Sequence, residues 1–184
     1  MAKQNLKQLK LRILRVSRLH FYLALILAVQ IIVYDAWMLI QPETVFQRWI
    51  ATAILFAGAT VVWLLARSPS TKIVFYERLV SGLIVLDVLL ASFMVYQTRG
   101  MASTAVALYV VPILVAAVFH SRVALIATSF LCVAAYTTTA LAYFTLNFNE
   151  GYNVELYGTI GFYSAFMVLV AMIIWGLQNP SKND

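Results

Sequence analysis

Six long apolar stretches take up most of the 184-residue chain and limit what it can fold into. A helix needs about 20 apolar residues to cross about 30 Å of hydrocarbon, and each stretch has about that length. The stretches cover residues 19 to 40, 47 to 66, 79 to 97, 103 to 120, 122 to 146 and 156 to 177. A membrane β-barrel would instead alternate apolar and polar residues along each strand. We therefore predict an all-α, polytopic integral membrane protein with six transmembrane helices.

The charged residues divide this chain into three parts. Only 11% of all residues are charged, against roughly 25% in soluble proteins. We predict a basic amphipathic cytoplasmic tail at residues 1–18, a six-helix transmembrane domain at residues 19–177 and a short cytoplasmic tail at residues 178–184. In the first tail Leu6, Leu9, Ile13 and Val16 recur at helical spacing, which is typical of a helix lying in the membrane interface.

The distribution of Lys and Arg predicts how the chain is oriented. Eleven of the thirteen fall on one side of the predicted topology, and only Arg48 and Arg99 fall on the other. Basic loops stay in the cytoplasm during insertion, so both termini are predicted to be cytoplasmic. We expect a multi-pass protein of the bacterial inner membrane. Orientation and contact with anionic lipid account for the net charge of +6, and we expect no binding of nucleic acid.

One ionisable residue, Asp87, lies near the middle of the third apolar stretch, in LIVLDVLLASF. A charge at that depth costs several kcal/mol and normally faces a partner or a water-filled cavity. The carboxyl group either takes part in binding a proton or ligand, or fixes helix packing through hydrogen bonds. Both interpretations stay open.

The fifth stretch carries a polar stripe. Its members recur every three or four residues and therefore share one helical face: Thr128, Cys132, Tyr136, Thr139 and Tyr143. Such a face is expected to look into the helix bundle, where hydroxyl groups bond across helices. It lines a cavity in one interpretation and forms a packing seam in the other.

Residues 86–127 read LDVLLASFMVYQTRGMASTAVALYVVPILVAAVFHSRVALIA. This order of features resembles the membrane-embedded N-terminal region of bacterial sensor histidine kinases of the six-helix, redox- or quinone-linked type. In that family an Asp-containing third helix is followed by a Gly-Gly-x-x-Ser/Asn-Pro turn, a Leu-Tyr-x-x-Pro helix and a short basic turn. The corresponding positions are Asp87, Thr98, Gly100, Ser103, Leu108, Tyr109, Pro112 and Arg122. Arg99 and Thr104 stand where the family turn has a glycine and a proline.

The resemblance implies a sensory or regulatory membrane module that binds a hydrophobic or membrane-dissolved ligand, such as a quinone, or a membrane partner. It also implies a homodimer and a cytoplasmic kinase or other membrane protein as signalling partner. Together with the polar stripe, it gives these ligand or signalling candidates: Asp87, Arg99, Gly100, Ser103, Tyr109, Pro112, Tyr136 and Thr139. These residues do not specify which ligand is bound, so the identity of the cofactor, a quinone or another lipid-soluble ligand, stays open.

We expect no catalytic activity. The chain contains no phosphoacceptor and ATP-binding domains, no Ser-His-Asp arrangement, no Walker-type loop and no paired His-Glu metal motif. We therefore predict no catalytic residues and no metal ligands.

Two other functions are compatible with six apolar helices. Ala24 and Ala28 form a small-xxx-small pair, which allows close helix packing. In this pair, in its length and in its six spans the chain resembles the substrate-binding subunits of energy-coupling-factor vitamin transporters. The alternatives are therefore a small-solute-binding subunit of a membrane transporter, or a structural or assembly subunit of a membrane complex.

Overall fold

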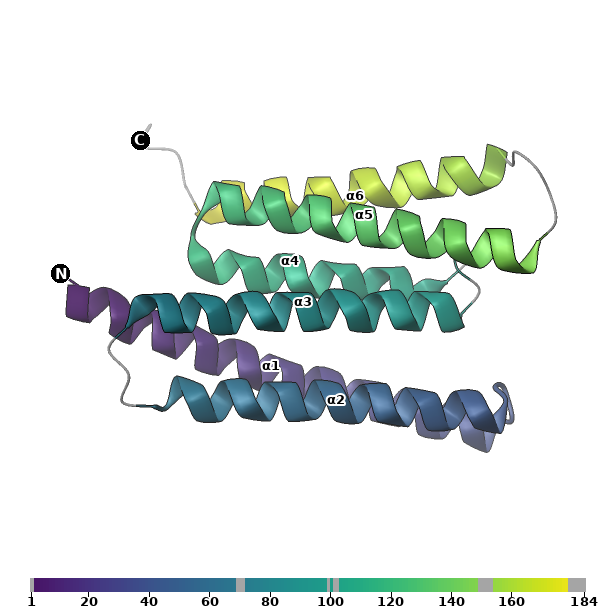
Figure 1. Ribbon diagram of the computed structural model, residues 1–184, viewed down its shortest axis with the longest axis horizontal. Helices are drawn as coiled ribbons and strands as arrows, with labels where there is room; N and C mark the ends of the chain where they lie inside the picture. The colour runs from purple at the N-terminus through teal and green to yellow at the C-terminus, as the bar shows by residue number, and fades with distance from the viewer. Residues whose placement is uncertain (1, 69–71, 99, 101–102, 149–153, 179–184) are drawn as a thin grey trace. The chain divides into compact units, whose positions relative to one another are not determined.

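The computed structural model describes residues 2–68, 72–98, 100, 103–148 and 154–178, and within them all regular secondary structure is helical, as predicted (Figure 1). The long helices are α1 (Ala2–Ala36), α2 (Pro42–Ala66), α3 (Ile73–Gln97), α5 (Arg122–Asn147) and α6 (Val154–Gln178). Between α3 and α5 the chain forms the 3-10 helix η2 (Thr104–Tyr109), the α-helix α4 (Val110–Ala116) and the 3-10 helix η3 (Ala117–Phe119).

Five helices in the described part of the chain are long and apolar enough to cross a membrane. They correspond to five of the six predicted spans. The sixth predicted span, residues 103 to 120, is helical but shorter, and it consists of η2, α4 and η3 rather than one regular α-helix. Pro112 lies in the first turn of α4, where its missing N–H prevents regular α-helical bonding back to Leu108.

Two ends of the first helix differ from the predicted boundaries. The basic tail and the first apolar stretch form one continuous helix from Ala2 to Ala36. That helix stops before residue 40 because Met38 adopts a left-handed conformation, with φ 53°. The Leu39 N–H then bonds to the Tyr34 carbonyl and the Met38 N–H to the Asp35 carbonyl, which is the Schellman arrangement. Pro42 begins α2, where a proline needs no N–H partner.

Contacts divide the chain into two compact units, Met1–Leu86 and Asp87–Asp184. In the first unit α1 packs along α2, and the rings of Phe21 and Phe56 lie 5.3 Å apart. Gly58 on α2 lets α3 approach, because a Cβ atom there would collide with the side chain of Leu86. In the second unit α4 packs against both α5 and α6, and α5 packs against α6.

The N-terminal basic segment is held to the connection that follows α2. Lys10 donates a hydrogen bond from Nζ to the Ser68 carbonyl at 2.9 Å, and the Tyr76 hydroxyl donates to the same carbonyl at 3.0 Å. The Lys10 ammonium also lies 5.0 Å from the centre of the Tyr76 ring, within the range of a cation–π contact. Lys10 therefore has a structural role in addition to any contact with lipid.

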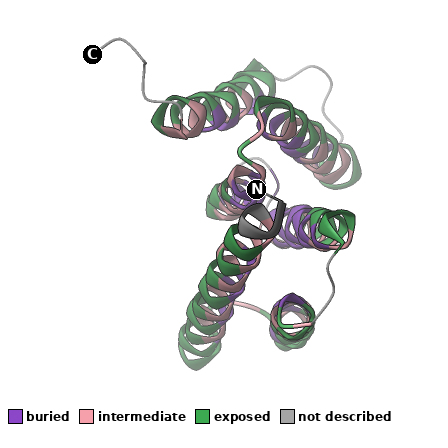
Figure 2. Cartoon of the chain, turned by 90° about the vertical axis from the view of Figure 1, so that its left-hand side faces the viewer, coloured by how far each residue is buried: buried purple, intermediate pink, exposed green. Residues whose placement is uncertain are grey.

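The long helices each have an exposed face (Figure 2), and many of the exposed residues are large and apolar. On α1 Leu25 and Ile26 are 62% and 64% exposed, and on α6 Phe162 and Met172 are 67% and 66% exposed. Of the 18 residues that form the most apolar segment of α6, only 17% are buried, against 50% for the corresponding segment of α3. Removing one such side chain from water is worth about 1.5–3 kcal/mol, so these faces are suited to a hydrocarbon environment.

Replacing Tyr76 with Phe should lower the free energy of unfolding by about 1 kcal/mol, because the buried ring loses its hydrogen bond to the Ser68 carbonyl. The measurement is thermal unfolding of the detergent-solubilised protein. Tyr22→Phe is the control, since Tyr22 is 62% exposed. Identical unfolding of Tyr76→Phe and the parent would show that this bond contributes nothing.

Candidate functional site

Three tyrosines from three helical segments meet in the interior of the second unit. The ring of Tyr136 on α5 lies edge-on between Tyr109 of η2 and Tyr163 of α6, at centroid distances of 6.0 Å and 5.8 Å. Edge-to-face rings at these distances attract one another beyond their apolar burial. We refer to Tyr109, Tyr136 and Tyr163 as the tyrosine cluster. It joins the 3-10 segment to the two long helices that follow it.

Hydrogen bonds connect one end of the tyrosine cluster to α3. The hydroxyl oxygens of Tyr109 and Ser92 lie 2.8 Å apart, and Ser92 also donates to the Val88 carbonyl at 2.8 Å. Thr139 of α5 lies beside the Tyr109 hydroxyl and donates to the Ala135 carbonyl at 2.8 Å. Tyr109 is completely buried, so this set of hydroxyl groups fixes η2 between α3 and α5.

Asp87 also faces the interior of this unit. Its side chain is only 3% exposed, and it lies close enough to Cys132 of α5 for the carboxyl and thiol groups to interact electrostatically. Cys132 is fully buried and free. The carboxyl group is thus enclosed by protein, as predicted for an acid at this position of an apolar helix.

Tyr136 differs from the other polar groups at this site. It is completely buried, and its hydroxyl oxygen has no hydrogen-bond partner among the described residues. Leaving a buried hydroxyl unpaired costs about 1–3 kcal/mol, so such a group calls for a physical explanation. Tyr109 and Tyr163 contact Tyr136 through their rings.

The turn before η2 is built around Gly100 and Ser103. Gly100 has φ 61°, and a Cβ atom there would lie 2.7 Å from the ring of Tyr143, so both the backbone and the space require glycine. Ser103 caps η2 by accepting a hydrogen bond from the Ala105 N–H at 3.0 Å, and its hydroxyl also bonds to that of Thr98. Arg99 lies outside the described residues.

The structure brings some of the predicted candidates together and places the others elsewhere in the second unit. Tyr109, Tyr136 and Thr139 meet at the tyrosine cluster, and Asp87 lies near Cys132 in the same unit. Gly100 and Ser103 form the turn, and Pro112 is buried at the beginning of α4. Of the predicted polar stripe, Thr128, Cys132 and Tyr136 are buried, and Thr139 and Tyr143 are half-buried.

Two contributors were missed from sequence. Ser92 is a single hydroxyl within an apolar stretch, and Tyr163 is one of several aromatic residues on α6. Neither belongs to a periodic polar pattern. Asp87 and Ser92 are five residues apart on one helix, and this spacing does not place them on the same face. The sequence therefore offers no reason to group Ser92 with Asp87.

No protein-family model, curated protein or solved structure matches this chain. Among the described residues no three His, Cys, Asp or Glu side chains lie together in a way that could hold a metal ion. The tyrosine cluster and its neighbours offer hydrogen bonding from tyrosine, serine and threonine hydroxyls, and the buried Asp87 lies near Cys132 in the same unit.

Two single-atom changes should affect stability in different ways. Tyr109→Phe should lower the free energy of unfolding by about 1 kcal/mol because it breaks the bond to Ser92. Tyr136→Phe should leave it unchanged or raise it, since the lost hydroxyl is buried without a partner. Thermal unfolding in detergent measures both. Destabilisation of Tyr136→Phe to the same extent as Tyr109→Phe would contradict this assignment.

Proposed function

We propose that the chain is inserted in the bacterial inner membrane with six crossings and with both termini in the cytoplasm. Five apolar helices and their exposed apolar faces support insertion. For the sixth crossing, the stretched 3-10 geometry is important. At about 2.0 Å per residue in η2 and η3 and about 1.5 Å in α4, the segment Thr104–Phe119 extends about 28 Å, close to the thickness of the hydrocarbon.

Cysteine labelling tests this topology. Gln41→Cys lies in the predicted outer connection between α1 and α2, and Lys72→Cys lies in the predicted cytoplasmic connection before α3. A membrane-impermeant maleimide added to spheroplasts should label only Gln41→Cys, and both variants after permeabilisation. The native Cys132 is fully buried and serves as the unlabelled background. Labelling of Lys72→Cys in intact spheroplasts would contradict the orientation.

We further propose that the protein is a non-catalytic sensory or regulatory module for a lipid-soluble ligand that carries a hydrogen-bond acceptor. The observation that supports this most directly is the buried, unpaired hydroxyl of Tyr136. A ligand carbonyl oxygen would accept a hydrogen bond from it and remove the cost of about 1–3 kcal/mol. Quinones combine a carbonyl oxygen with a flat ring that stacks on aromatic side chains, and the resemblance to quinone-linked sensor kinases supports the same class.

The route of the signal would begin at η2. Tyr109 contacts Tyr136 through its ring and Ser92 of α3 through its hydroxyl. A ligand bound at Tyr136 would therefore affect both of these contacts. A 3-10 helix has poorer hydrogen-bond geometry than an α-helix and commonly marks a hinge. A ligand shifts such a segment only by binding one arrangement more tightly than the other. The shift would pass along α3 to a cytoplasmic kinase or another membrane protein.

Binding of a radiolabelled short-tail benzoquinone to the purified full chain tests the ligand class. The parent should bind saturably, and Tyr136→Phe should bind about tenfold more weakly because one hydrogen bond worth about 1.4 kcal/mol is lost. Asp87→Asn should remain folded but change the affinity or the response of the partner. Tyr22→Phe, a change of the same atom at an exposed site, is the matched control.

Other results of this experiment would contradict the proposal. Equal affinity of Tyr136→Phe and Tyr22→Phe would remove the hydroxyl from the ligand site. Absence of saturable benzoquinone binding in the parent would rule against this ligand class. Arg99→Ala tests whether the turn takes part: an unchanged affinity would leave the turn as a connector.

A further inference from the structure

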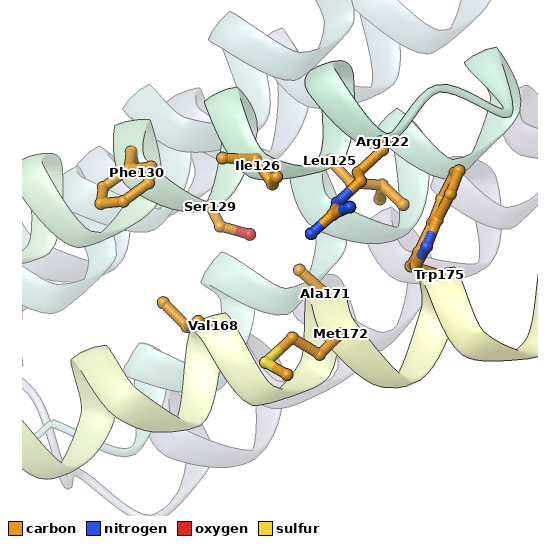
Figure 3. A pocket seen from close by; sticks show the side chains of 9 residues that line it. All are labelled: Arg122, Leu125, Ile126, Ser129, Phe130, Val168, Ala171, Met172 and Trp175. Atoms are coloured by element: carbon orange, nitrogen blue, oxygen red, sulfur yellow. The ribbon is translucent and has the colours of Figure 1, made fainter.

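A hollow of about 360 Å³ lies between α5 and α6 in the second unit. Its volume is within the range of roughly 300–1,000 Å³ that is typical of small-molecule sites. Arg122 and Trp175 lie at one end, Ser129 of α5 and Ala171 and Met172 of α6 lie between the ends, and Phe130 borders the other end (Figure 3). We refer to these six residues as the α5–α6 groove. None of them belongs to the tyrosine cluster.

The groove continues into a second hollow of about 650 Å³. The two share Phe130, Val168 and Met172, and the second reaches Val133 on α5 and Phe162 on α6. Its wall is almost entirely apolar. From Arg122 to Val133 the combined groove extends about 16 Å at about 1.5 Å per residue. This length matches one leaflet, which is about 15 Å of the hydrocarbon core.

Two polar side chains line the first hollow of the groove, Arg122 at its end and Ser129 two helical turns along α5. Figure 3 shows the Arg122 guanidinium and the Ser129 hydroxyl directed into the same space, above Ala171. Ser129 is 2% exposed, and its hydroxyl oxygen has no hydrogen-bond partner among the described residues. Arg122 is exposed and forms no ion pair with any described residue. A cation and an unpaired buried hydroxyl thus face an otherwise apolar channel.

We infer that the α5–α6 groove binds one anionic phospholipid, with its phosphate at Arg122 and one acyl chain along Phe130, Met172 and Phe162. The charge of the guanidinium complements the phosphate, and arginine can donate two hydrogen bonds to it. Ser129 lies two helical turns deeper than Arg122, where its hydroxyl donates to an ester carbonyl oxygen of the lipid. Trp175 lies at the headgroup level, where tryptophan is commonly found.

The chemistry of the groove favours a phospholipid over a free anion. A free phosphate would leave the long apolar part empty, and a lipid without a phosphate group would leave Arg122 without an anionic partner. Most of the basic residues are predicted on the same side as Arg122, and anionic lipids are concentrated at the cytoplasmic surface of membranes. This inference goes beyond the proposed function, because it concerns a second site whose lining residues differ from those near Tyr136.

Native mass spectrometry of the full chain in mild detergent tests the site, with dioleoyl phosphatidylglycerol as the probe and dioleoyl phosphatidylcholine as the zwitterionic counterpart with no net charge. The parent should bind one phosphatidylglycerol at least about fivefold more tightly than phosphatidylcholine, because the choline cation offsets the phosphate charge that attracts Arg122, and one basic residue near an anionic lipid is worth about 1 kcal/mol. Arg122→Gln should abolish this preference. Arg78→Gln, which changes an exposed arginine of α3, should retain it.

A neighbouring pair of variants tests the apolar part independently of charge. Met172→Trp fills the groove, whereas Ile173→Trp places the same ring on an exposed position of α6 that does not line it. Only Met172→Trp should weaken binding of phosphatidylglycerol, by about fivefold or more, the loss that accompanies about 1 kcal/mol. Circular dichroism confirms that each variant remains helical.

Three outcomes would overturn the inference. They are equal binding of the two phospholipids by the parent, equal losses in Arg122→Gln and Arg78→Gln, and equal losses in Met172→Trp and Ile173→Trp. Oleic acid distinguishes the source of the anionic group: if it displaces phosphatidylglycerol at equal concentration, the occupant is a free fatty acid instead. Benzoquinone binding is unaffected by Arg122→Gln if the two sites are independent, so either proposal can fail alone.

Discussion

The long helices of this chain expose large apolar side chains, and in water each of those side chains would cost about 1.5–3 kcal/mol. The same helices satisfy their backbone N–H and C=O groups internally, which hydrocarbon requires because it offers no hydrogen-bond partners. The rest of the fold follows from this constraint. In the second unit the hydroxyl groups of Ser92, Tyr109 and Thr139 lie between packed helices, where they bond to one another or to backbone carbonyls.

Within that interior, neither Tyr109 nor Tyr136 exposes any surface, but their hydroxyl groups have different surroundings. Tyr109 is bonded to Ser92, and the contact holds a 3-10 segment against α3. Tyr136 has the same degree of burial but no partner. A polar group that reduces stability is more readily explained by binding than by packing, because proteins commonly give up stability at functional sites. This contrast is the physical basis of the proposed ligand site.

Much of the architecture could be predicted from sequence, because each long apolar stretch has a strong and local signal. The buried face of α5 could also be predicted, since Thr128, Cys132 and Tyr136 repeat with helical spacing. The end of α1 was harder to predict from the sequence, because its Schellman turn uses Met38 rather than the usual glycine. The roles of Ser92 and Tyr163 depend on contacts between helices distant in sequence, so no local pattern could have indicated them.

The central claim is that a ligand at Tyr136 shifts the 3-10 segment η2. Amide hydrogen exchange of the full chain in lipid nanodiscs, with and without short-tail benzoquinone, tests it most directly, because it follows the backbone bonds of Thr104–Tyr109 themselves. The account predicts that the quinone changes exchange in this segment and in the part of α3 around Ser92, and that Tyr136→Phe removes the change. Identical exchange of η2 with and without a bound quinone would contradict it.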